Sequence, residues 1–430
     1  MKVGVAGLWH LGTVTAACLA SAGHDVVAYD GNAETIAGLR RGVLPVAEPG
    51  LGELMGRSVA AGRLSFSSSP ADLAGSDVTW IAYDTPMDEH DHADVGAVID
   101  ATAPILPFVA QGSLVLISSQ LAVGSTRRLA ERYRQVRADG TASFGYSPEN
   151  LRLGSAIDAF TRPARVVVGV DSPNARARVE RLLQPFTDRI EWMSVESAEM
   201  TKHALNAFLA TSVAFANELG VLCERLGADA LEVERGLKSD PRIGPRAYLR
   251  AGAAFAGGTL ARDVSYLIEM GRAETLPAHI MAAVRESNEA HKDWPRRRLV
   301  EMIGDPSGRS IAILGLTYKP GTDTLRGSTA LSTSRWLNER GARVAAYDPG
   351  VRALPAEVGR FVNLRPSVEA TLRGADAAIV ATEWPEFSAI SADDVLQWME
   401  RPLILDAGRF LQKQLGTDER IRYVSVGRAA

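Results

Sequence analysis

The chain has 430 residues, of which 46% are hydrophobic and 23% charged, and its formal net charge is −4. This length allows about three domains of ~150 residues, and the charge gives no reason to expect a nucleic acid or an anionic membrane as a partner. We find no apolar run of the ~20 residues that cross a bilayer, no room for a secretory leader before the first strand, and too few cysteines for a disulfide framework or zinc cluster, so we expect a cytoplasmic protein.

The N-terminal segment predicts a βαβ unit. It contains an apolar strand, the turn GLWHLG, a small-residue helix and a second strand, at Lys2–Gly7, 7–12, Thr13–Ala22 and His24–Asp30. Gly7 and Gly12 let the backbone approach a pyrophosphate, and a helix N-terminus adds free N–H groups. Asp30 is placed to accept hydrogen bonds from ribose hydroxyls, with no arginine after it for a 2′-phosphate. The pattern favours an NAD site over NADP and over a plain strand–turn–helix, although Trp9 replaces the middle glycine of the fingerprint.

Three more apolar strands are expected in this half, at Asp77–Tyr83, Ser113–Ser118 and Arg165–Val170. Their alternation with helix-like stretches predicts a parallel, doubly wound sheet. The segment DEHDH at Asp88–His92 has metal-ligating residue types. Because these residues are consecutive in a turn-rich loop, their side chains diverge, and we interpret them as a solvated loop with no metal.

A long helix is expected over Val195–Arg225, where apolar residues recur at helical spacing. Glu199, Lys202 and Asn206 are three and four residues apart and so share one face. A solvated surface is the ordinary interpretation of such residues. The position of this helix between two nucleotide-type halves favours a functional site instead.

The remaining chain predicts a helical middle and a second α/β unit. We expect helices at Asp229–Leu237 and Leu276–Asp293, the loop Asp240–Pro245 and the small-residue segment Ala251–Asp263 between them, and an arginine-rich tether after Trp294-Pro295. Strands follow at Ser310–Gly315, Arg343–Asp348, Ala377–Thr382 and Pro402–Asp406. Two nucleotide-type domains imply two nucleotide-bearing ligands.

The motifs, in order, resemble the UDP-glucose/GDP-mannose dehydrogenase family along nearly the whole chain. Beside GLWHLG and Asp30, they are LPVAEPGL at Leu44–Leu51, DTP at Asp84–Pro86, SPENLRLGSA at Ser147–Ala156, AEMTKHALNAFLA at Ala198–Ala210, DPRIG at Asp240–Gly244, LGLTYKPGTD at Leu314–Asp323 and ATEWPEF at Ala381–Phe387. The resemblance implies an α/β fold with two Rossmann-like, doubly wound domains joined by a long central helix and a helical middle domain. It divides the chain at 1–194, 195–296 and 297–430. NAD is expected on the first domain, a nucleotide sugar on the last, and a homodimer through the central helices.

The resemblance also implies a reaction. Members oxidise the C6 alcohol of a nucleotide sugar to a carboxylate by two hydride transfers to NAD, through a cysteine thioester. By motif, Lys202 and Asn206 stabilise the C6 oxygen as an alkoxide, which a fixed cation does well in a water-poor cleft. Glu149 orients the sugar or a water, Asp263 supports the reacting end, and Arg242 reaches the sugar nucleotide of a neighbouring subunit.

Further residues follow from the same match. The cofactor-binding set is Gly7, Leu11, Gly12, Asp30, Thr85, Gln120, Arg262 and Arg326. The substrate-binding set is Glu149, Lys202, Asn206, Arg242, Tyr248, Gly257 and Lys319.

The chain departs from the family at the second half of the chemistry. Thr259 occupies the position of the nucleophilic cysteine, Leu153 that of a second glutamate and Gln120 that of a threonine. A threonine hydroxyl needs an adjacent base to attack a carbonyl, whereas a thiol is partly ionised at neutral pH. Cys223 lies about 30 Å from Lys202 along the helix, and Cys18 is expected to be a packed thiol. Three changes at one site indicate altered chemistry or none.

Four functions follow, in order of preference. The first is one hydride transfer that stops at an aldehyde or ketone. The second is the full oxidation to the uronate through a hydrated aldehyde, with Glu149 or Lys202 as the base. The third is a catalytically silent nucleotide-sugar binder or regulatory subunit, which would not need the Lys202–Asn206 pair. The fourth, a phosphogluconate-type or hydroxyacid dehydrogenase, is disfavoured by the second α/β domain.

Overall fold

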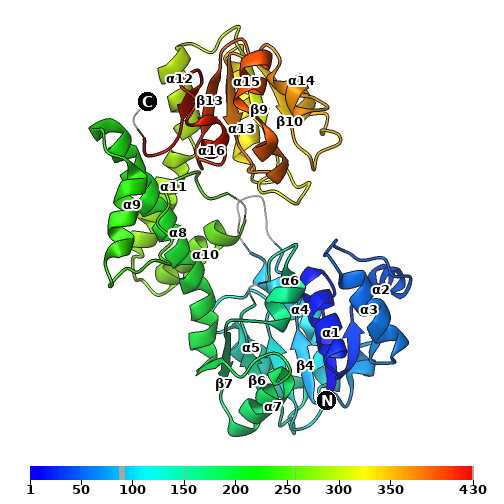
Figure 1. Ribbon diagram of the computed structural model, residues 1–430. Helices are drawn as coiled ribbons and strands as arrows, with labels where there is room; N and C mark the ends of the chain where they lie inside the picture. Colours follow the sequence, from blue (N-terminus) through cyan, green and yellow to red (C-terminus); the bar gives the residue numbers. More distant parts are fainter. Residues whose placement is uncertain (87–92, 150, 257, 429–430) are drawn as a thin grey trace. The chain divides into compact units, whose positions relative to one another are not determined.

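The computed structural model describes residues 1–86, 93–149, 151–256 and 258–428 (Figure 1). It divides into two compact units, Met1–Ala204 and Leu205–Ala430. The predicted loop Asp88–His92 and the predicted substrate residue Gly257 lie outside the described residues.

The first unit contains an eight-stranded sheet of order β3-β2-β1-β4-β5-β6-β7-β8 within its described residues. The strands are β1 (Lys2–Ala6), β2 (Asp25–Tyr29), β3 (Leu64–Ser67), β4 (Val78–Ile81), β5 (Leu114–Ile117), β6 (Ser143–Tyr146), β7 (Val166–Val170) and β8 (Ile190–Met193). Between them lie α1 (His10–Ser21), α2 (Ala33–Arg40), α3 (Leu51–Ala60), η1 (Pro70–Leu73), α4 (Val95–Thr102), η2 (Ala103–Phe108), α5 (Ser125–Val136), α6 (Ala156–Thr161) and α7 (Pro173–Leu183). The doubly wound fold is confirmed, with one correction to the parallel sheet: β7 runs antiparallel to β6.

The small side chains of helix α1 determine how closely this helix packs in the first unit. Its sequence HLGTVTAACLAS is rich in small side chains, and Gly12 to Ala20 are all buried. A helix that is apolar on all sides belongs in a core, and α1 packs against β1, β2, α3 and α6. The small side chains allow this close approach, which places the N-terminus of α1 directly beyond the carboxyl end of β1.

The second unit begins within the long helix α8 (Val195–Leu226), whose residues up to Ala204 belong to the first unit. The other helices of the helical part are α9 (Ala230–Ser239), α10 (Gly258–Ala273), α11 (His279–His291) and α12 (Trp294–Ile303). The arginine-rich tether predicted after Trp294 is wrong, because this stretch is α12. Pro295 lies in its first turn, where proline removes no helical hydrogen bond.

A six-stranded parallel sheet of order β11-β10-β9-β12-β13-β14 follows within the described residues. The strands are β9 (Ser310–Leu314), β10 (Arg343–Tyr347), β11 (Asn363–Leu364), β12 (Ala377–Val380), β13 (Leu403–Asp406) and β14 (Arg422–Val424). They alternate with α13 (Thr329–Glu339), η3 (Val358–Arg360), α14 (Val368–Leu372), η4 (Pro385–Ala389), α15 (Ala392–Trp398) and α16 (Gln412–Leu415). The second Rossmann-like domain is therefore confirmed.

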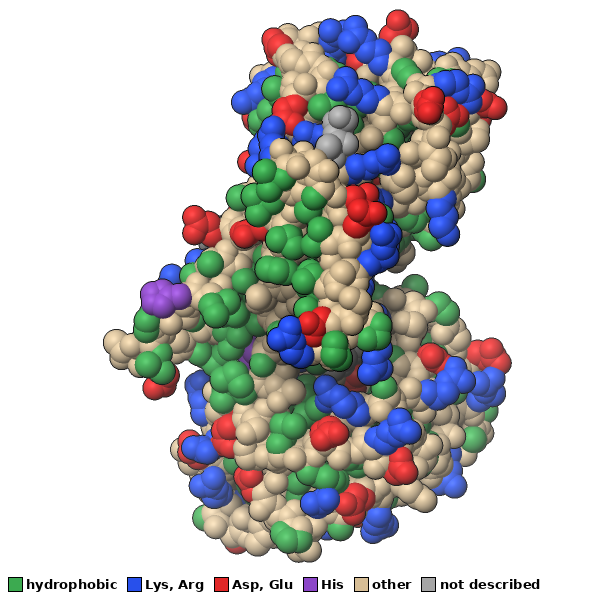
Figure 2. All heavy atoms as spheres, turned by 60° about the vertical axis from the view of Figure 1, so that its left-hand side comes forward, with side chains coloured by type: hydrophobic (Ala, Val, Ile, Leu, Met, Phe, Trp, Pro, Cys, Tyr) green, Lys and Arg blue, Asp and Glu red, His purple; other side chains and the backbone are tan. Residues whose placement is uncertain are grey.

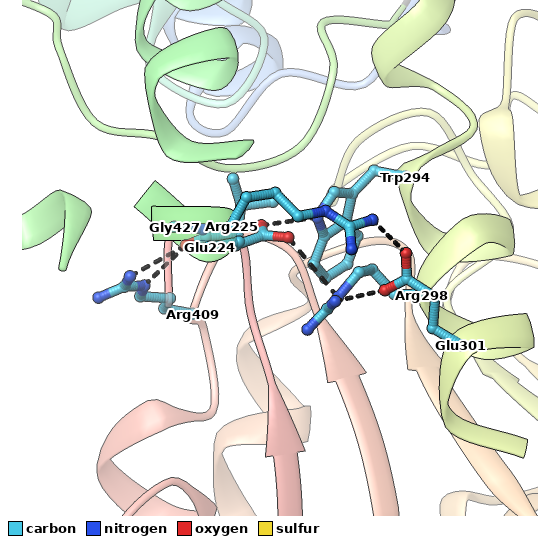
Figure 3. A network of polar contacts seen from close by, with 8 residues as sticks. Glu224, Arg225, Trp294, Arg298, Glu301, Arg409 and Gly427 are labelled. Carbon is cyan, nitrogen blue, oxygen red and sulfur yellow. Dashed lines mark hydrogen bonds and ion pairs between the residues drawn. The ribbon is translucent and has the colours of Figure 1, made fainter. Parts of the chain in front are cut away.

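Two buried glutamates anchor α8, one in each unit. In the first unit, Glu199 accepts hydrogen bonds from the N–H groups of Gly124 and Thr126 at 2.6 and 2.9 Å, at the start of α5. In the second unit, Glu224 accepts from the Trp294 indole and the Gly427 N–H, both at 2.9 Å (Figure 3). Carboxylates buried in this way hold a helix against specific partners rather than facing water.

The length and composition of α8 alone would allow it to cross a membrane, with a mean hydropathy of 1.3 in its apolar window. This corrects our expectation that no segment is long and apolar enough. Half of that window is buried inside the protein, as in the core helix of a folded domain.

Candidate active site

The glycine-rich turn after β1 has the geometry that a dinucleotide requires. Gly7 has φ +91°, and a side chain there would approach the Tyr83 backbone N to 2.6 Å. A Cβ atom on Gly12 would lie 1.8 Å from the Gly7 carbonyl oxygen. Both positions therefore exclude any residue larger than glycine, and the backbone enters α1 without a side chain in the way.

Trp9 takes the place of the middle glycine without backbone strain. Its φ is −87°, which any residue adopts, and its side chain is 53% exposed. The first turn of α1 has no acidic residue, and no side chain caps its N–H groups among the described residues. These groups and the helix dipole are free to bind an anion, so the turn fits the pyrophosphate of NAD.

Asp30 lies beyond the end of β2, facing this turn. Its Oδ2 accepts a hydrogen bond from the Leu8 N–H at 2.8 Å, and its Oδ1 accepts one from the Asn32 N–H at 2.9 Å. The residue is half-buried. Since a carboxylate has about four acceptor sites, Asp30 retains the capacity to bind ribose hydroxyls as the sequence predicts.

Thr85 and Gln120 lie on the loops after the adjacent strands β4 and β5. The Thr85 hydroxyl donates to the Gln120 carbonyl oxygen at 2.6 Å. The predicted cofactor residue Leu11 is half-buried in the first turn of α1. The structure thus places these three residues at the carboxyl edge of the sheet, where ligands of open α/β sheets bind. Their contact with a cofactor stays a prediction.

Glu48 is a residue whose role sequence reasoning missed, although its motif was part of the resemblance. Its carboxylate, which is buried, contacts His10 Nε2 at 2.9 Å and accepts from the N–H groups of Gly154 and Ala156, both at 2.9 Å. Burial raises the pKa of this carboxyl, but these hydrogen bonds outweigh it and hold the pKa below its ordinary value. Glu48 thereby ties the glycine-rich turn to the loop that follows Glu149.

Lys202 and Glu149 come together within the first unit. Lys202 is only 9% exposed, and its Nζ donates to the Glu149 backbone oxygen at 3.0 Å. One turn earlier on α8, Glu199 is fully buried, and its carboxylate accepts a hydrogen bond at the start of α5. The solvated-surface interpretation of this helix face is therefore wrong. A cation held out of water by defined partners is typical of a functional site.

Asn206 and Asp263 come together within the second unit. The Asn206 amide donates to the Asp263 carboxylate at 2.5 Å, and both side chains are buried. Thr259 lies one turn before Asp263 in α10 and is exposed, and Arg262 is half-buried. The position of the expected nucleophile thus sits on the same helix as a buried carboxylate, and it carries a hydroxyl.

Three further predicted substrate residues, Arg242, Tyr248 and Lys319, and the predicted cofactor residue Arg326 also lie in the second unit. Arg242 pairs with Asp240 of its own loop at 2.7 Å, and Tyr248 is 61% exposed. The Lys319 ammonium lies 5.5 Å from the Tyr318 ring centroid, and Arg326 is exposed in the loop before α13. Their roles stay predictions.

Cys18 is a packed thiol, as the sequence predicts. Cys18 and Cys223 are free and buried. Burial, with a smaller contribution from the charge of Glu149, raises the pKa of the Cys18 thiol to about 12. Among the described residues, no group of His, Cys, Asp and Glu could hold a metal ion.

Comparison with known proteins decides the family. The NAD binding domain of the UDP-glucose/GDP-mannose dehydrogenase family matches residues 1–187, its central domain 196–290 and its UDP binding domain 312–413. The chain belongs to this family. It is an NAD-dependent nucleotide-sugar dehydrogenase, and the turn at Gly7–Gly12 with Asp30 fits the cofactor.

Relatives of known name cover the whole chain. The UDP-glucose 6-dehydrogenase of Bacillus subtilis is 34% identical, covering 100% of this chain and 94% of the relative. That of Rhizobium meliloti is also 34% identical, covering 100% of both. Among solved structures, a UDP-glucose dehydrogenase from Pyrobaculum islandicum aligns with a TM-score of 0.88 at 32% identity, covering 100% of this chain and 98% of the other. A UDP-D-ManNAc dehydrogenase from Pyrococcus horikoshii aligns with a TM-score of 0.85 at 26% identity, covering 100% of this chain and 99% of the other.

Proposed function

We propose that this dehydrogenase oxidises a UDP-sugar of the UDP-glucose type at C6 and stops after one hydride transfer. The proposal rests on two observations together, the residues that are retained and the one that is replaced. The buried Lys202 and the buried Asn206–Asp263 pair retain what the first oxidation needs, whereas Thr259 stands where a nucleophilic cysteine is needed for the second.

In this proposal the turn at Gly7–Gly12 and Asp30 would hold NAD, which would supply the acceptor for the hydride of C6. Lys202 and Asn206, on successive turns of α8, hold the C6 oxygen and stabilise the negative charge that develops on it. Glu149 orients the sugar or the water that takes the hydroxyl proton. A preorganised cation of this kind contributes about 10²–10³ to the rate. Without a thiol, no covalent intermediate forms at Thr259, and the carbonyl product leaves.

The test counts NADH formed per nucleotide sugar and traps the product with hydroxylamine before mass spectrometry. One NADH and a trapped carbonyl support the proposal. Two NADH and a carboxylate show the full oxidation through a hydrated aldehyde. Thr259→Cys is expected to raise the carboxylate yield, and no change would mean that Leu153 or Gln120 also limits the second step.

Lys202→Met separates an enzyme from a silent binder. The variant is expected to lower kcat by about 10²-fold or more, and Lys413→Met, an exposed lysine of α16, serves as the matched control. If the wild type forms no NADH with any nucleotide sugar, and Lys202→Met leaves nucleotide-sugar affinity unchanged, the chain is a binding or regulatory subunit instead.

We also propose a homodimer through the central helices. In the second unit, Phe208, Phe215 and Leu222 repeat every seven residues along α8 and are exposed, as is Leu226. Apolar side chains gather over this helical part (Figure 2). Such a stripe is typical of an interface. Phe215→Glu is expected to give monomers in sedimentation velocity, with Lys413→Glu, exposed on α16 and outside the central helices, as the control.

The division into domains at 1–194, 195–296 and 297–430 stays part of this proposal, as does a cytoplasmic location. The two free, buried cysteines fit a reducing compartment.

A further inference from the structure

A cavity of about 610 Å³ lies at the edge of the second sheet where its strands begin. Ser310, Arg343 and Asn363, the first residues of β9, β10 and β11, line it. Helix α14 packs against β9 and β10 beside it (Figure 1). Nucleotides in open α/β sheets bind beyond the opposite, carboxyl ends of the strands. The part of the cavity lined by Ser310, Arg343 and Asn363 therefore lies away from the place expected for the nucleotide sugar, whereas Arg365 directly follows the carboxyl end of β11.

The rim of this cavity is strongly basic. Its lining contains Arg343, Arg360, Arg365 and Arg373, and no Asp or Glu. Arg373 pairs with Glu369 of α14. The Arg343 guanidinium donates to the Ser310 hydroxyl, at 2.9 and 3.2 Å. Within the described ranges, none of Arg343, Arg360 and Arg365 has an ion-pair partner. Three guanidinium groups thus line a concavity that has no acidic residue in its lining. Carboxylates lie beside it, at Glu369, which pairs with Arg373, and at Asp376, which accepts from the Ser310 N–H and pairs with Arg309.

The floor of the cavity is apolar. Ile311, Val344 and Val362 line it and are almost completely buried. Phe361 forms part of the wall, and Asn338 contributes an amide. An apolar floor with a basic rim matches a ligand that joins a flat, weakly polar group to phosphate, because arginine binds phosphate with two parallel hydrogen bonds.

We propose that this cavity binds a phosphorylated small molecule of the nucleotide class, separately from NAD and the nucleotide sugar. Its volume lies in the range of about 300–1,000 Å³ that small-molecule sites occupy. The phosphates contact Arg343, Arg360 and Arg365, and the base lies over the apolar floor beside Phe361. A concave site on an acidic chain suits a small anion better than a polymer.

The test titrates the full-length protein by calorimetry with NAD and UDP at saturating concentrations, so that both sites of the proposed reaction are filled. Pyrophosphate and ATP are the two probes. Both are expected to bind, and ATP more tightly, because only ATP also covers the floor. Arg360→Ala/Arg365→Ala is expected to weaken ATP binding by about 100-fold, since each charge-assisted hydrogen bond is worth roughly tenfold or more. Arg422→Ala, at the exposed start of β14 in the same sheet, is the control and leaves the affinity unchanged.

The proposal is overturned if neither probe binds, or if the double variant keeps the wild-type affinity. Equal affinities for pyrophosphate and ATP overturn the nucleotide class. An arginine-dependent affinity found only for a single-stranded oligonucleotide points to a polymer surface instead. Arg365→Gln alone carries the same test if the double variant does not fold. Failure of the protein to bind NAD or UDP contradicts the proposed reaction and leaves the ATP titration readable.

Discussion

The two α/β domains build the same turn and then use it differently. Gly7 and Gly315 follow their first strands with φ +91° and +92°, and a side chain on either would collide with the backbone of Tyr83 or Thr382. Each glycine N–H donates to the last carbonyl of the neighbouring strand, at 3.0 and 2.8 Å. Beyond this point they diverge, because α1 begins at His10 whereas α13 begins only at Thr329.

The two domains also differ in the acidic residue that follows their second strand, Asp30 after β2 and Asp348 after β10. Asp30 is half-buried and accepts one N–H on each oxygen. Asp348 is 1% exposed, and its Oδ2 alone accepts from the Leu316 and Thr317 N–H groups, the Thr317 hydroxyl and the Trp384 indole. The first acid is left available to a ligand, and the second is saturated by the protein. The UDP-binding domain must therefore recognise its nucleotide through other residues.

The largest effect is expected from Asp348→Ala. It leaves several buried donors unpaired, which lowers the free energy of unfolding of the second unit by about 3–5 kcal/mol. Asp30→Ala is the matched variant, and it is expected to weaken NAD binding by about 10–100-fold with little change in stability. Hydrogen exchange by mass spectrometry measures the loss of stability in each variant, and calorimetry measures the affinity for NAD. If the two variants lose stability equally, the distinction between a structural and a ligand-binding acid fails.

Glu224→Ala is expected to have the next largest effect. It leaves the Trp294 indole and the Gly427 N–H without their acceptor, and it leaves the Arg298 guanidinium, 3.6 Å from Glu224, paired with Glu301 alone. Removing one member of a buried charged network costs about 2–4 kcal/mol. Thermal unfolding measures the loss, and Glu218→Ala, exposed on the same helix, is the control. Equal midpoints for the two variants would contradict an anchoring role for Glu224.

These anchors also show what the sequence could and could not predict. The glycine turn, Asp30 and α8 follow from local patterns, and all are present. The buried glutamates are different, since Glu48 binds Gly154 across 106 residues and Glu224 binds Gly427 across 203. No spacing rule reaches so far. The short strand β8 was missed because IEWM shows no clear alternation, and α12 was missed because its arginines hide its apolar face.

A smaller effect on stability is expected when the pH is lowered. His24 and His291, one in each unit, contact the carbonyl oxygens of Leu182 and Gly252 at 3.1 and 2.8 Å. Burial lowers the pKa of both imidazoles below the ordinary value. The folded protein therefore favours their neutral forms. The stability they contribute is complete above about pH 6.5 and is lost as the pH falls below it.

The melting temperature of the wild type is expected to fall between pH 7.5 and 5.5, and His291→Gln is expected to reduce that fall in the transition of the second unit. His24→Gln makes the same comparison for the first unit. A fall that is unchanged in both variants would assign the acid sensitivity to other groups.

The smallest effect concerns the reactivity of the thiols, which bears on our proposal that no cysteine serves as the nucleophile. Cys18 belongs to the first unit and Cys223 to the second, and both are buried. With its pKa raised to about 12, the Cys18 thiol is almost fully protonated at pH 8, and only a thiolate reacts with iodoacetamide. The folded wild type is therefore expected to take up no label by mass spectrometry, whereas Thr259→Cys, at an exposed position of α10, takes up one. Labelling of Cys18 or Cys223 in the native protein would reopen a native cysteine as the nucleophile and would weaken the case for oxidation that stops after one hydride transfer.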